Sequence, residues 1–257
     1  MNFEAFLKKS YLTLVILFLY LPLIILVIFS FNKAQYSSQW NHFTLKWFTQ
    51  LMADDYLLQA LKNSIILGIL SALISTSISV IAATVLIFQN GKKNIKSFLM
   101  VPSFLIILPD LILGVGFLMI LNLLHIPFGF VSLLIAHITF CMPFIIFTII
   151  NQINCFNIDL YDASLDLGAS KFQTWKTIIL PLLAPSLFSA FLLAFTLSFD
   201  DVVISYFVAG PEFNILPLTV FSMMRSGATP EINALCTLIL LFSFVLIFFT
   251  QGKMRKS

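Results

Sequence analysis

The chain has 257 residues, of which 60% are hydrophobic and only 10% are charged, and its mean hydropathy is +1.04. Soluble domains carry about 25% charged residues, so this chain has too few to cover a surface that faces water. The composition excludes an ordinary soluble enzyme. It indicates an all-α integral membrane protein, because the apolar runs are long enough to be helices rather than barrel strands. The net charge of +3 identifies no partner, and we expect no nucleic acid among the partners.

Six apolar segments predict six transmembrane helices in a single membrane domain, residues 1–257. The third and fourth segments are separated by Pro127 and Gly129, which both interrupt helices. The longest polar stretch on the expected cytoplasmic side is the loop of residues 152–181, between the fourth and fifth segments. In chain order, the six expected spans lie at about residues 11–31, 63–88, 97–124, 130–151, 182–208 and 232–251.

Basic residues set the expected orientation, because the cytoplasmic loops of membrane proteins are rich in lysine and arginine. If the N-terminus lies inside, ten basic residues fall on the cytoplasmic side and four on the other side. We therefore expect both termini to be cytoplasmic. The ten are Lys8, Lys9, Lys92, Lys93, Lys96, Lys171, Lys176, Lys253, Arg255 and Lys256, and the four are Lys33, Lys46, Lys62 and Arg225.

The polar stretch DLYDASLDLGASKFQTWKTIILP, residues 159–181, predicts a helix–glycine–helix elbow on the cytoplasmic side. Its first part is rich in small residues and indicates a short helix that Gly168 ends. Ser170 and Gln173 have the spacing of a capping box, which predicts the start of a second helix. Pro181 is expected to mark a bend into the next span. From the residues alone, this elbow could equally dock a partner or pack on its own helix ends.

The spacing of certain residues in this elbow resembles the EAA loop of ABC importer permeases. In that family, a short coupling helix in the loop inserts into a groove on the ATPase subunit. The chain differs in having Asp162 for the usual Glu and Ser164 for the second Ala, changes that keep charge and small size. The resemblance implies that eight residues couple the chain to an ATPase: Asp162, Ala163, Ser164, Gly168, Ala169, Ile178, Leu180 and Pro181.

Stretches over nearly the whole chain, among them HITFCMPF (137–144) and SFDDVVISYFVAGP (198–211), resemble permease subunits of spermidine/putrescine ABC importers. This resemblance implies the type I ABC importer permease fold and a place in the bacterial cytoplasmic (inner) membrane. It also implies three kinds of partner: a second related permease, two ATPase subunits that bind ATP and Mg²⁺, and an extracytoplasmic polyamine-binding protein. The sequence has no G-x-x-x-x-G-K-[ST] phosphate loop, so we expect this chain to bind no cofactor and to catalyse no reaction.

Three carboxylates lie inside the predicted spans, at Asp110, Asp200 and Asp201. A charge at mid-bilayer costs roughly 2.5–3.5 kcal/mol on insertion scales. Counted from Lys96 and Pro181, where the two spans begin, Asp110 and Asp200 lie about 21 Å and 28 Å along a helix. The carboxylates are therefore expected at similar depths, in the middle to outer half of the membrane.

Acids within a membrane usually face a cavity and mark the path of an ion or substrate. No lysine or arginine lies at this depth to neutralise them, so the carboxylates suit a cationic solute. The rings of Phe199 and Tyr206 are candidates for cation–π contacts with an ammonium group. The predicted solute path is therefore lined by Asp110, Asp200, Asp201, Phe199 and Tyr206.

Structural roles for the same residues stay open. Adjacent helical residues point about 100° apart, so one of Asp200 and Asp201 is expected to meet solute while the other bonds to a neighbouring helix. The sequence does not choose between them. Asp110 follows Pro109, and its carboxylate could instead satisfy amides freed by the proline. His137 lies in an apolar run, where we expect a hydrogen-bonded structural role rather than metal binding. No metal site is predicted.

Two other functions are compatible with parts of the sequence. An importer for another small cation or organic solute would carry the same EAA-like loop, because that loop contacts the ATPase and not the cargo. An intramembrane aspartyl protease would pair Asp110 with Asp200 or Asp201. Against the protease, no tyrosine precedes Asp110 and the second site has no Gly-x-Gly-Asp sequence.

Overall fold

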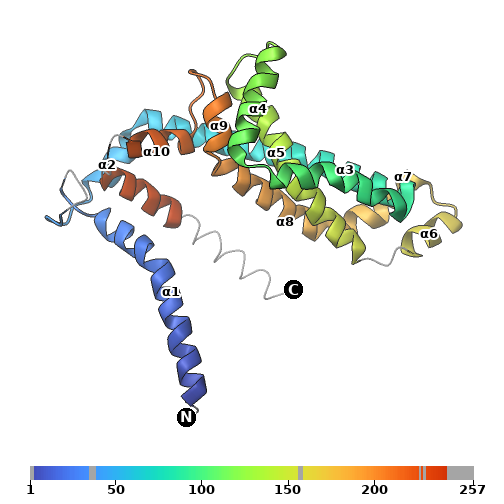
Figure 1. The fold of residues 1–257 in the computed structure, drawn as a ribbon, viewed down its shortest axis with the longest axis horizontal. Helices are drawn as coiled ribbons and strands as arrows, with labels where there is room; N and C mark the ends of the chain where they lie inside the picture. Colours follow the sequence, from blue (N-terminus) through green and yellow to red (C-terminus); the bar gives the residue numbers. More distant parts are fainter. Residues whose placement is uncertain (1–2, 35–38, 156–158, 226, 228–229, 242–257) are drawn as a thin grey trace. The chain divides into compact units, whose positions relative to one another are not determined.

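The computed structural model describes residues 3–34, 39–155, 159–225, 227 and 230–241, which are mostly helical (Figure 1). Within these residues, the single β-bridge joins Asn32 and Phe43. The chain divides into two compact units. One is Gln59–Leu218, and the other is formed by Met1–Leu58 and Thr219–Ser257.

Four helices in the described residues are long and apolar enough to cross a membrane. They are Lys8–Phe29, Asp55–Leu86, Phe130–Ile153 and Lys171–Phe199. A fifth crossing is possible if Phe98–Ile107 and Asp110–Leu123 form one broken span. The sixth expected span, 232–251, lies partly outside the described residues. Its described part belongs to the apolar helix Pro230–Leu241. The chain is thus an all-helical membrane protein, and the count of six spans stays a prediction.

The smaller unit begins with α1 (Phe3–Phe29) and α2 (Lys46–Ala53). The loop between these helices is held by Asn32, whose side-chain oxygen accepts a hydrogen bond from the Asn41 amide at 2.9 Å. The indole N–H of Trp47 donates to the backbone carbonyl of Asn32 at 2.7 Å. The unit also includes most of α10 (Leu216–Arg225), which starts in the larger unit.

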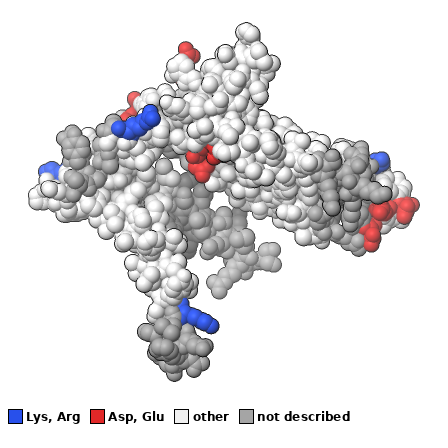
Figure 2. Space-filling view, viewed as in Figure 1, with Lys and Arg blue, Asp and Glu red and all other residues white. Residues whose placement is uncertain are grey.

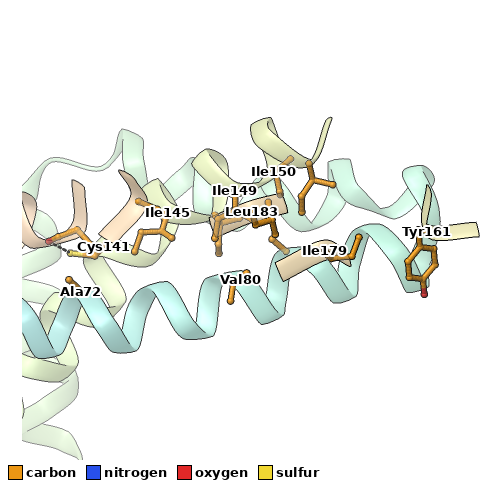
Figure 3. Close-up of a cluster of buried hydrophobic side chains, with 14 residues drawn as sticks. Ala72, Val80, Cys141, Ile145, Ile149, Ile150, Tyr161, Ile179 and Leu183 are labelled. Atoms are coloured by element: carbon orange, nitrogen blue, oxygen red, sulfur yellow. Dashed lines mark hydrogen bonds between the residues drawn. The ribbon is translucent and has the colours of Figure 1, made fainter. Parts of the chain in front are cut away.

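The core of the larger unit lies where α5 (Phe130–Asn154) packs along α8 (Leu180–Phe199) (Figure 1). The two helices are antiparallel, because His137 contacts Ser198 and, one turn later, Cys141 contacts Ala194. Figure 3 shows the isoleucines of α5 meeting side chains of α3 and α8 in this core. Its buried members are Ala72, Val80, Ala83, Cys141, Ile145, Ile146, Ile149, Ile150, Ile153, Tyr161, Ile179, Leu183, Ala190 and Ala194.

The helix α3 (Asp55–Ile107) is hydrogen-bonded as one element of 53 residues, yet the chain reverses direction within it. Ser71 contacts Ser198 at 2.9 Å, and the following helix, α4 (Asp110–Leu123), lies against α9 (Val203–Val208), just beyond α8. A straight helix from Thr84 to Ile107 would add about 35 Å and would carry α4 away from α9. The chain therefore turns back between Thr84 and Phe98, and Figure 1 shows it running toward α7 and returning to α4.

The predicted third span is not one straight helix. Its two parts, Phe98–Ile107 and α4, meet at an angle of 109°. The break falls at Leu108 and Pro109, because a proline disfavours helical geometry in the residue before it, and Pro109 itself is extended, with φ −59° and ψ 138°. The break lies just before Asp110 and redirects the chain after it, and the depth of Asp110 in the membrane stays a prediction.

The elbow, residues 159–181, contains α6 (Asp159–Asp166), α7 (Lys171–Thr174) and a π-helical turn, η1 (Trp175–Ile179). Gly168 ends α6 with φ +88°. Ser170 caps α7: its Oγ accepts from the Gln173 amide, and the Gln173 side chain accepts from the Ser170 amide. The helix–glycine–helix elbow and its capping box are confirmed.

The expected bend at Pro181 is wrong. Helical geometry continues from α7 through η1 into α8, and both Ile179 and Leu180 keep helical angles. Proline normally breaks a helix because its ring clashes with the carbonyl four residues earlier. A π-turn is wider than an α-turn, and η1 lies directly before Pro181, so the wide turn gives the ring room. Lys171–Phe199 is consequently one helical rod.

Candidate functional site

The two neighbouring aspartates lie where α8 ends. Asp200 is the C-cap of α8, and its amide donates to the Thr196 carbonyl at 3.1 Å. The next helix, α9, begins at Val203, so Asp201 falls in the short break between them. The Asp200 side chain is exposed, whereas Asp201 is only 8% exposed. The helix end therefore separates two carboxylates that would have been neighbours on one helical surface.

The buried carboxylate of Asp201 closes the first turn of α9. One oxygen, Oδ2, accepts from the amide and the hydroxyl of Ser205, both at 2.8 Å. The other, Oδ1, accepts from the Ile204 amide at 3.3 Å. A carboxylate at a helix N-terminus is stabilised by the free amides and by the helix dipole. Asp201 thus makes the kind of structural hydrogen bonds that the sequence expected of one of the two aspartates, and its place in the solute path stays a prediction.

His137 of α5 lies beside this carboxylate and is fully buried. Its Nε2 is 3.6 Å from Oδ2 of Asp201 and 3.0 Å from Oγ of Ser205. Its Nδ1 is 2.6 Å from Oγ of Ser198, which also accepts from Ser71 of α3 at 2.9 Å. The expected hydrogen-bonded role of His137 is confirmed.

Asp110 lies at the same end of the α4–α9 pair as Asp200. Gly114 of α4 meets Ile204 and Phe207, and the loop after α4 reaches the far end of α9, where the Phe128 carbonyl lies against Gly210. The two helices therefore run parallel, and their first residues lie at one end. Asp110 is the first residue of α4, and its side chain is exposed. Two exposed acids thus lie toward one end of a parallel helix pair.

Aromatic rings flank the break on both sides. Phe199 is half-buried and stacks on Phe195, with ring centroids 5.5 Å apart. Tyr206 is 57% exposed and meets Phe207 edge-on, with centroids 5.8 Å apart. No lysine or arginine occurs in the sequences of α4, α5, α8 or α9. This region therefore combines exposed acids and an exposed aromatic ring on helices that carry no lysine or arginine, which suits a positively charged solute.

The elbow presents a mixed surface. Gly168 allows a Schellman ending for α6, in which the Ala169 amide donates to Ser164 O and the Gly168 amide donates to Leu165 O. Leu167, directly before this turn, is 89% exposed. Acidic side chains gather over α6 (Figure 2), and the exposed acids of that helix are Asp159, Asp162 and Asp166.

The residues of the predicted coupling set divide by exposure. Asp162, Ala163, Gly168 and Pro181 are exposed, and Ala169, Ile178 and Leu180 are half-buried. Ser164 is buried, and its hydroxyl lies 2.7 Å from that of Thr174 in α7, which joins the two arms of the elbow. The elbow is therefore packed internally through Ser164 while its acids and Leu167 stay accessible.

Sequence reasoning missed the partners of Asp201. Ser198 and Ser205 lie three residues before and four residues after it, so their spacing could have shown that they share its side. Nothing in the sequence places Ser71 or His137 beside them, because these residues come from other helices. Among the described residues, no group of three or more His, Cys, Asp or Glu side chains is placed to hold a metal ion.

The model of one protein family, the binding-protein-dependent transport system inner membrane component, matches residues 95–255. The chain belongs to this family. It is 40% identical over 247 residues to the spermidine/putrescine transport system permease protein PotC of Escherichia coli (strain K12), covering 95% of the chain and 92% of that protein. It is 34% identical over 229 residues to the putrescine transport system permease protein PotI of the same strain, covering 87% and 82%.

The fold resembles a solved structure of a bacterial ABC transporter involved in the import of the acidic polysaccharide alginate. The TM-score is 0.76 at 15% identity, over 97% of the chain and 95% of that one. The predicted permease family and permease fold are thus confirmed. This inner membrane component is a membrane-spanning transport subunit and not an enzyme, so the protease hypothesis is not retained.

Proposed function

We propose that this permease carries polyamines, of the spermidine and putrescine class, as one subunit of an ATP-driven importer. The observation that carries the proposal is the break between α8 and α9, where Asp200 is exposed and Asp201 is buried and bonded. An exposed carboxylate beside Phe199 and Tyr206 offers an ammonium group both charge and ring faces. The similarity to PotC and PotI supports the same cargo class.

The charge of the site says more about the class of cargo than the fold does. The solved transporter of similar fold takes part in import of an acidic polysaccharide, so the fold alone does not select cargo. In the present chain, Asp110 and Asp200 would repel an anion and attract a cation. Polyamines carry several ammonium groups on an apolar chain, which matches acids spaced among aromatic and aliphatic side chains.

The elbow supplies the link to ATP. It would dock on a separate ATPase that binds ATP and Mg²⁺, with Leu167 and the acids of α6 on the accessible surface. Motion of the ATPase would pass through Ser164 and Thr174 into α7, and along the continuous rod Lys171–Phe199 to the break beside Asp200. One helical rod thus connects the predicted coupling residues to the predicted solute step.

The complete importer in this proposal has two permeases, two ATPase subunits and an extracytoplasmic polyamine-binding protein in a bacterial cytoplasmic membrane. The permease would have six spans and both termini in the cytoplasm, an orientation that the distribution of basic residues supports. The elbow then faces the cytoplasm, where ATP is available.

Uptake by the assembled importer tests this function. Cells without polyamine importers of their own would express this chain with its partner permease, ATPase and binding protein. We expect saturable uptake of labelled spermidine or putrescine, lost when the ATPase cannot hydrolyse ATP. Unrelated amines and other organic cations are measured in parallel. Uptake of one of those solutes, with no uptake of either polyamine, would assign the site to another cargo.

A further inference from the structure

A chain of buried polar groups connects four helices around the break. It runs from Ser71 in α3 through Ser198 in α8 and His137 in α5 to Ser205 in α9, and it ends on Asp201. The first four side chains are at most 2% exposed, and Asp201 is 8% exposed. No water is available in the hydrocarbon core to replace a lost partner, so such a network holds its geometry only if it is complete.

One set of hydrogen-bond directions follows from the Asp201 carboxylate, which accepts the Ser205 hydroxyl hydrogen. Ser205 donates its hydroxyl hydrogen to Asp201, so its oxygen must accept from His137, which makes Nε2 the protonated nitrogen. The other nitrogen, Nδ1, then accepts from Ser198, and Ser198 accepts from Ser71. With the hydrogen on Nε2, the imidazole of His137 donates to Ser205 and accepts from Ser198, so both ring nitrogens have a partner.

We infer that His137 is a positioning residue for the solute step, acting through Asp201 on the placement of Asp200. His137 itself is fully buried and does not meet solute. It orients the Ser205 hydroxyl toward Asp201, and Asp201 holds the first turn of α9 in the orientation that leaves Asp200 outside. A side chain at 137 without these bonds leaves the buried hydroxyls of Ser205 and Ser198 each short of a partner, so Ser205 is no longer held toward Asp201 and the break loses its fixed geometry.

The positioning role of His137 rests on the proposed function in one respect, namely that the cargo of the importer is a polyamine. A merely structural His137 would contribute to the amount of folded importer and would leave cargo affinity unchanged. A positioning His137 changes the KM for uptake per folded importer. The tests below therefore normalise uptake to the amount of assembled complex in the membrane.

The first test compares replacements at position 137. His137→Gln keeps an amide that can donate to Ser205, whereas His137→Leu keeps volume without polar atoms. We expect His137→Leu to raise the KM for spermidine at least tenfold and His137→Gln to raise it two- to threefold. Ser198→Ala should raise it at least threefold. Ser189→Ala is the matched control in the same helix, since Ser189 is exposed and bonds only to its own helix at Pro185, and it should change KM less than 1.5-fold.

A double mutant separates action through Asp200 from a general effect. If His137 works by placing Asp200, then His137→Leu should raise KM less than twofold further once Asp200→Asn is present, because coupled residues give non-additive effects. Independent multiplication of the two KM effects would overturn the inference. So would an unchanged KM in normally assembled His137→Leu importer.

A measurement that needs no cargo keeps this inference separate from the proposed function. Cys141, Cys155 and Cys236 are replaced by Ala, and Asp200→Cys is reacted with a cationic methanethiosulfonate in the assembled complex. We expect His137→Leu to change the reaction rate at position 200 at least fivefold and Ser189→Ala to leave it unchanged. If the reaction rate at position 200 is unchanged in His137→Leu as well as in Ser189→Ala, the positioning role is overturned, even if polyamines are transported. A changed rate without polyamine uptake would support positioning and remove the proposed cargo.

Discussion

Single residues set the chemistry at the α8–α9 break. Asp200 and Asp201 are adjacent in the chain, yet the first carboxylate is exposed and the second is buried. The difference arises because α8 ends at Asp200, whereas the Asp201 side chain accepts from the amides of α9. The two side chains have the same acid group, yet Asp201 is the one that accepts from the amides of Ile204 and Ser205 in α9. Removing the charge should therefore have different consequences at the two positions.

We predict unequal effects for Asp200→Asn and Asp201→Asn on polyamine uptake. Asp200→Asn removes a charge from an exposed position, so KM should rise about tenfold, which corresponds to roughly 1.4 kcal/mol, with a normal amount of importer in the membrane. Asp201→Asn places an amide NH₂ against donors that need an acceptor, and a buried donor left unsatisfied costs about 1–3 kcal/mol. That variant should accumulate less and lose maximal rate.

Uptake kinetics and immunoblots of the membrane fraction distinguish these outcomes. Equal and negligible effects of the two Asn variants would contradict the assignment of one carboxylate to solute and the other to structure. A raised KM in Asp201→Asn, with an unchanged KM in Asp200→Asn, would reverse the assignment of the two carboxylates.

The close approach of α4 to α9 at Gly114 gives a second prediction about a single residue. A Cβ on Gly114 would lie 2.6 Å from a ring carbon of Phe207 and 3.4 Å from the Ile204 backbone, whereas a Cβ on Gly116 would meet nothing within 4 Å. Gly114→Ala should therefore push α4 off α9 and destabilise the complex by about 1–3 kcal/mol, the usual cost of overpacking. Gly116→Ala is the matched control and should be neutral or slightly stabilising, since Ala favours helix.

Thermal unfolding of the purified complex in detergent measures both glycine variants. Because α4 starts at Asp110, Gly114→Ala should also raise the KM for the cargo. Equal melting temperatures for the two variants would show that α4 and α9 do not approach as closely as described.

Helical elements connect the elbow to the break, and the proposed coupling route runs along them. The rod Lys171–Phe199 contains both the π-turn and α8, and the π-turn is also tied to α3 because the indole N–H of Trp175 donates to Oγ1 of Thr84 at 3.2 Å. π-turns are often found at functional sites, and this one allows the helix to accept Pro181. A displaced elbow would therefore move α3 together with α8.

We predict that Trp175→Phe weakens coupling while leaving the fold intact. Phenylalanine keeps an aromatic ring in the core and removes the N–H, which deletes a hydrogen bond worth about 0.5–1.5 kcal/mol. ATP hydrolysis stimulated by the loaded binding protein should fall two- to fivefold in reconstituted importer, with unstimulated hydrolysis unchanged. Thr84→Val removes the same bond from the other side and should reproduce the effect.

The matched control is Thr177→Val, because the exposed Thr177 hydroxyl bonds only along its own helix to Gln173. The double variant of Trp175 and Thr84 should be no worse than either single one. Full stimulation in both single variants would exclude this contact from the coupling route.

Local sequence rules predicted the elbow well and the break poorly. Gly168 and the Ser170–Gln173 pair act within a few residues, so their turn and cap follow from spacing alone. The π-turn before Pro181 depends on how a rod packs against α3, and short-range rules predicted a bend instead. For the aspartate pair, the sequence predicted two different roles, and what distinguishes the two residues is the burial of Asp201 and its bonds to the amides of α9.

Across the whole molecule, hydrophobicity sets the fold class but not the path of the chain. The apolar segments predicted an all-helical membrane protein, and the solved transporter shares the fold at 15% identity, so the pattern matters more than particular residues. The same pattern predicted separate spans at 63–88 and 97–124, in agreement with the reversal inside α3, but it did not predict the 109° break at Pro109. The broadly uncharged surface in Figure 2 fits contact with lipid.

Orientation is the prediction that concerns the molecule as a whole. The excess of basic residues on one side predicts a cytoplasmic N-terminus and elbow, with the segment around α2 outside. Three exposed lysines, Lys9, Lys46 and Lys176, mark positions at which the side of the membrane can be measured. Each is replaced by cysteine in a chain whose own three cysteines are changed to alanine, and cells are treated with a membrane-impermeant maleimide. Lys46→Cys should react in intact cells, whereas Lys9→Cys and Lys176→Cys should react only after permeabilisation. Reaction of Lys176→Cys in intact cells would put the elbow on the side without ATP, and the proposed coupling would then be wrong.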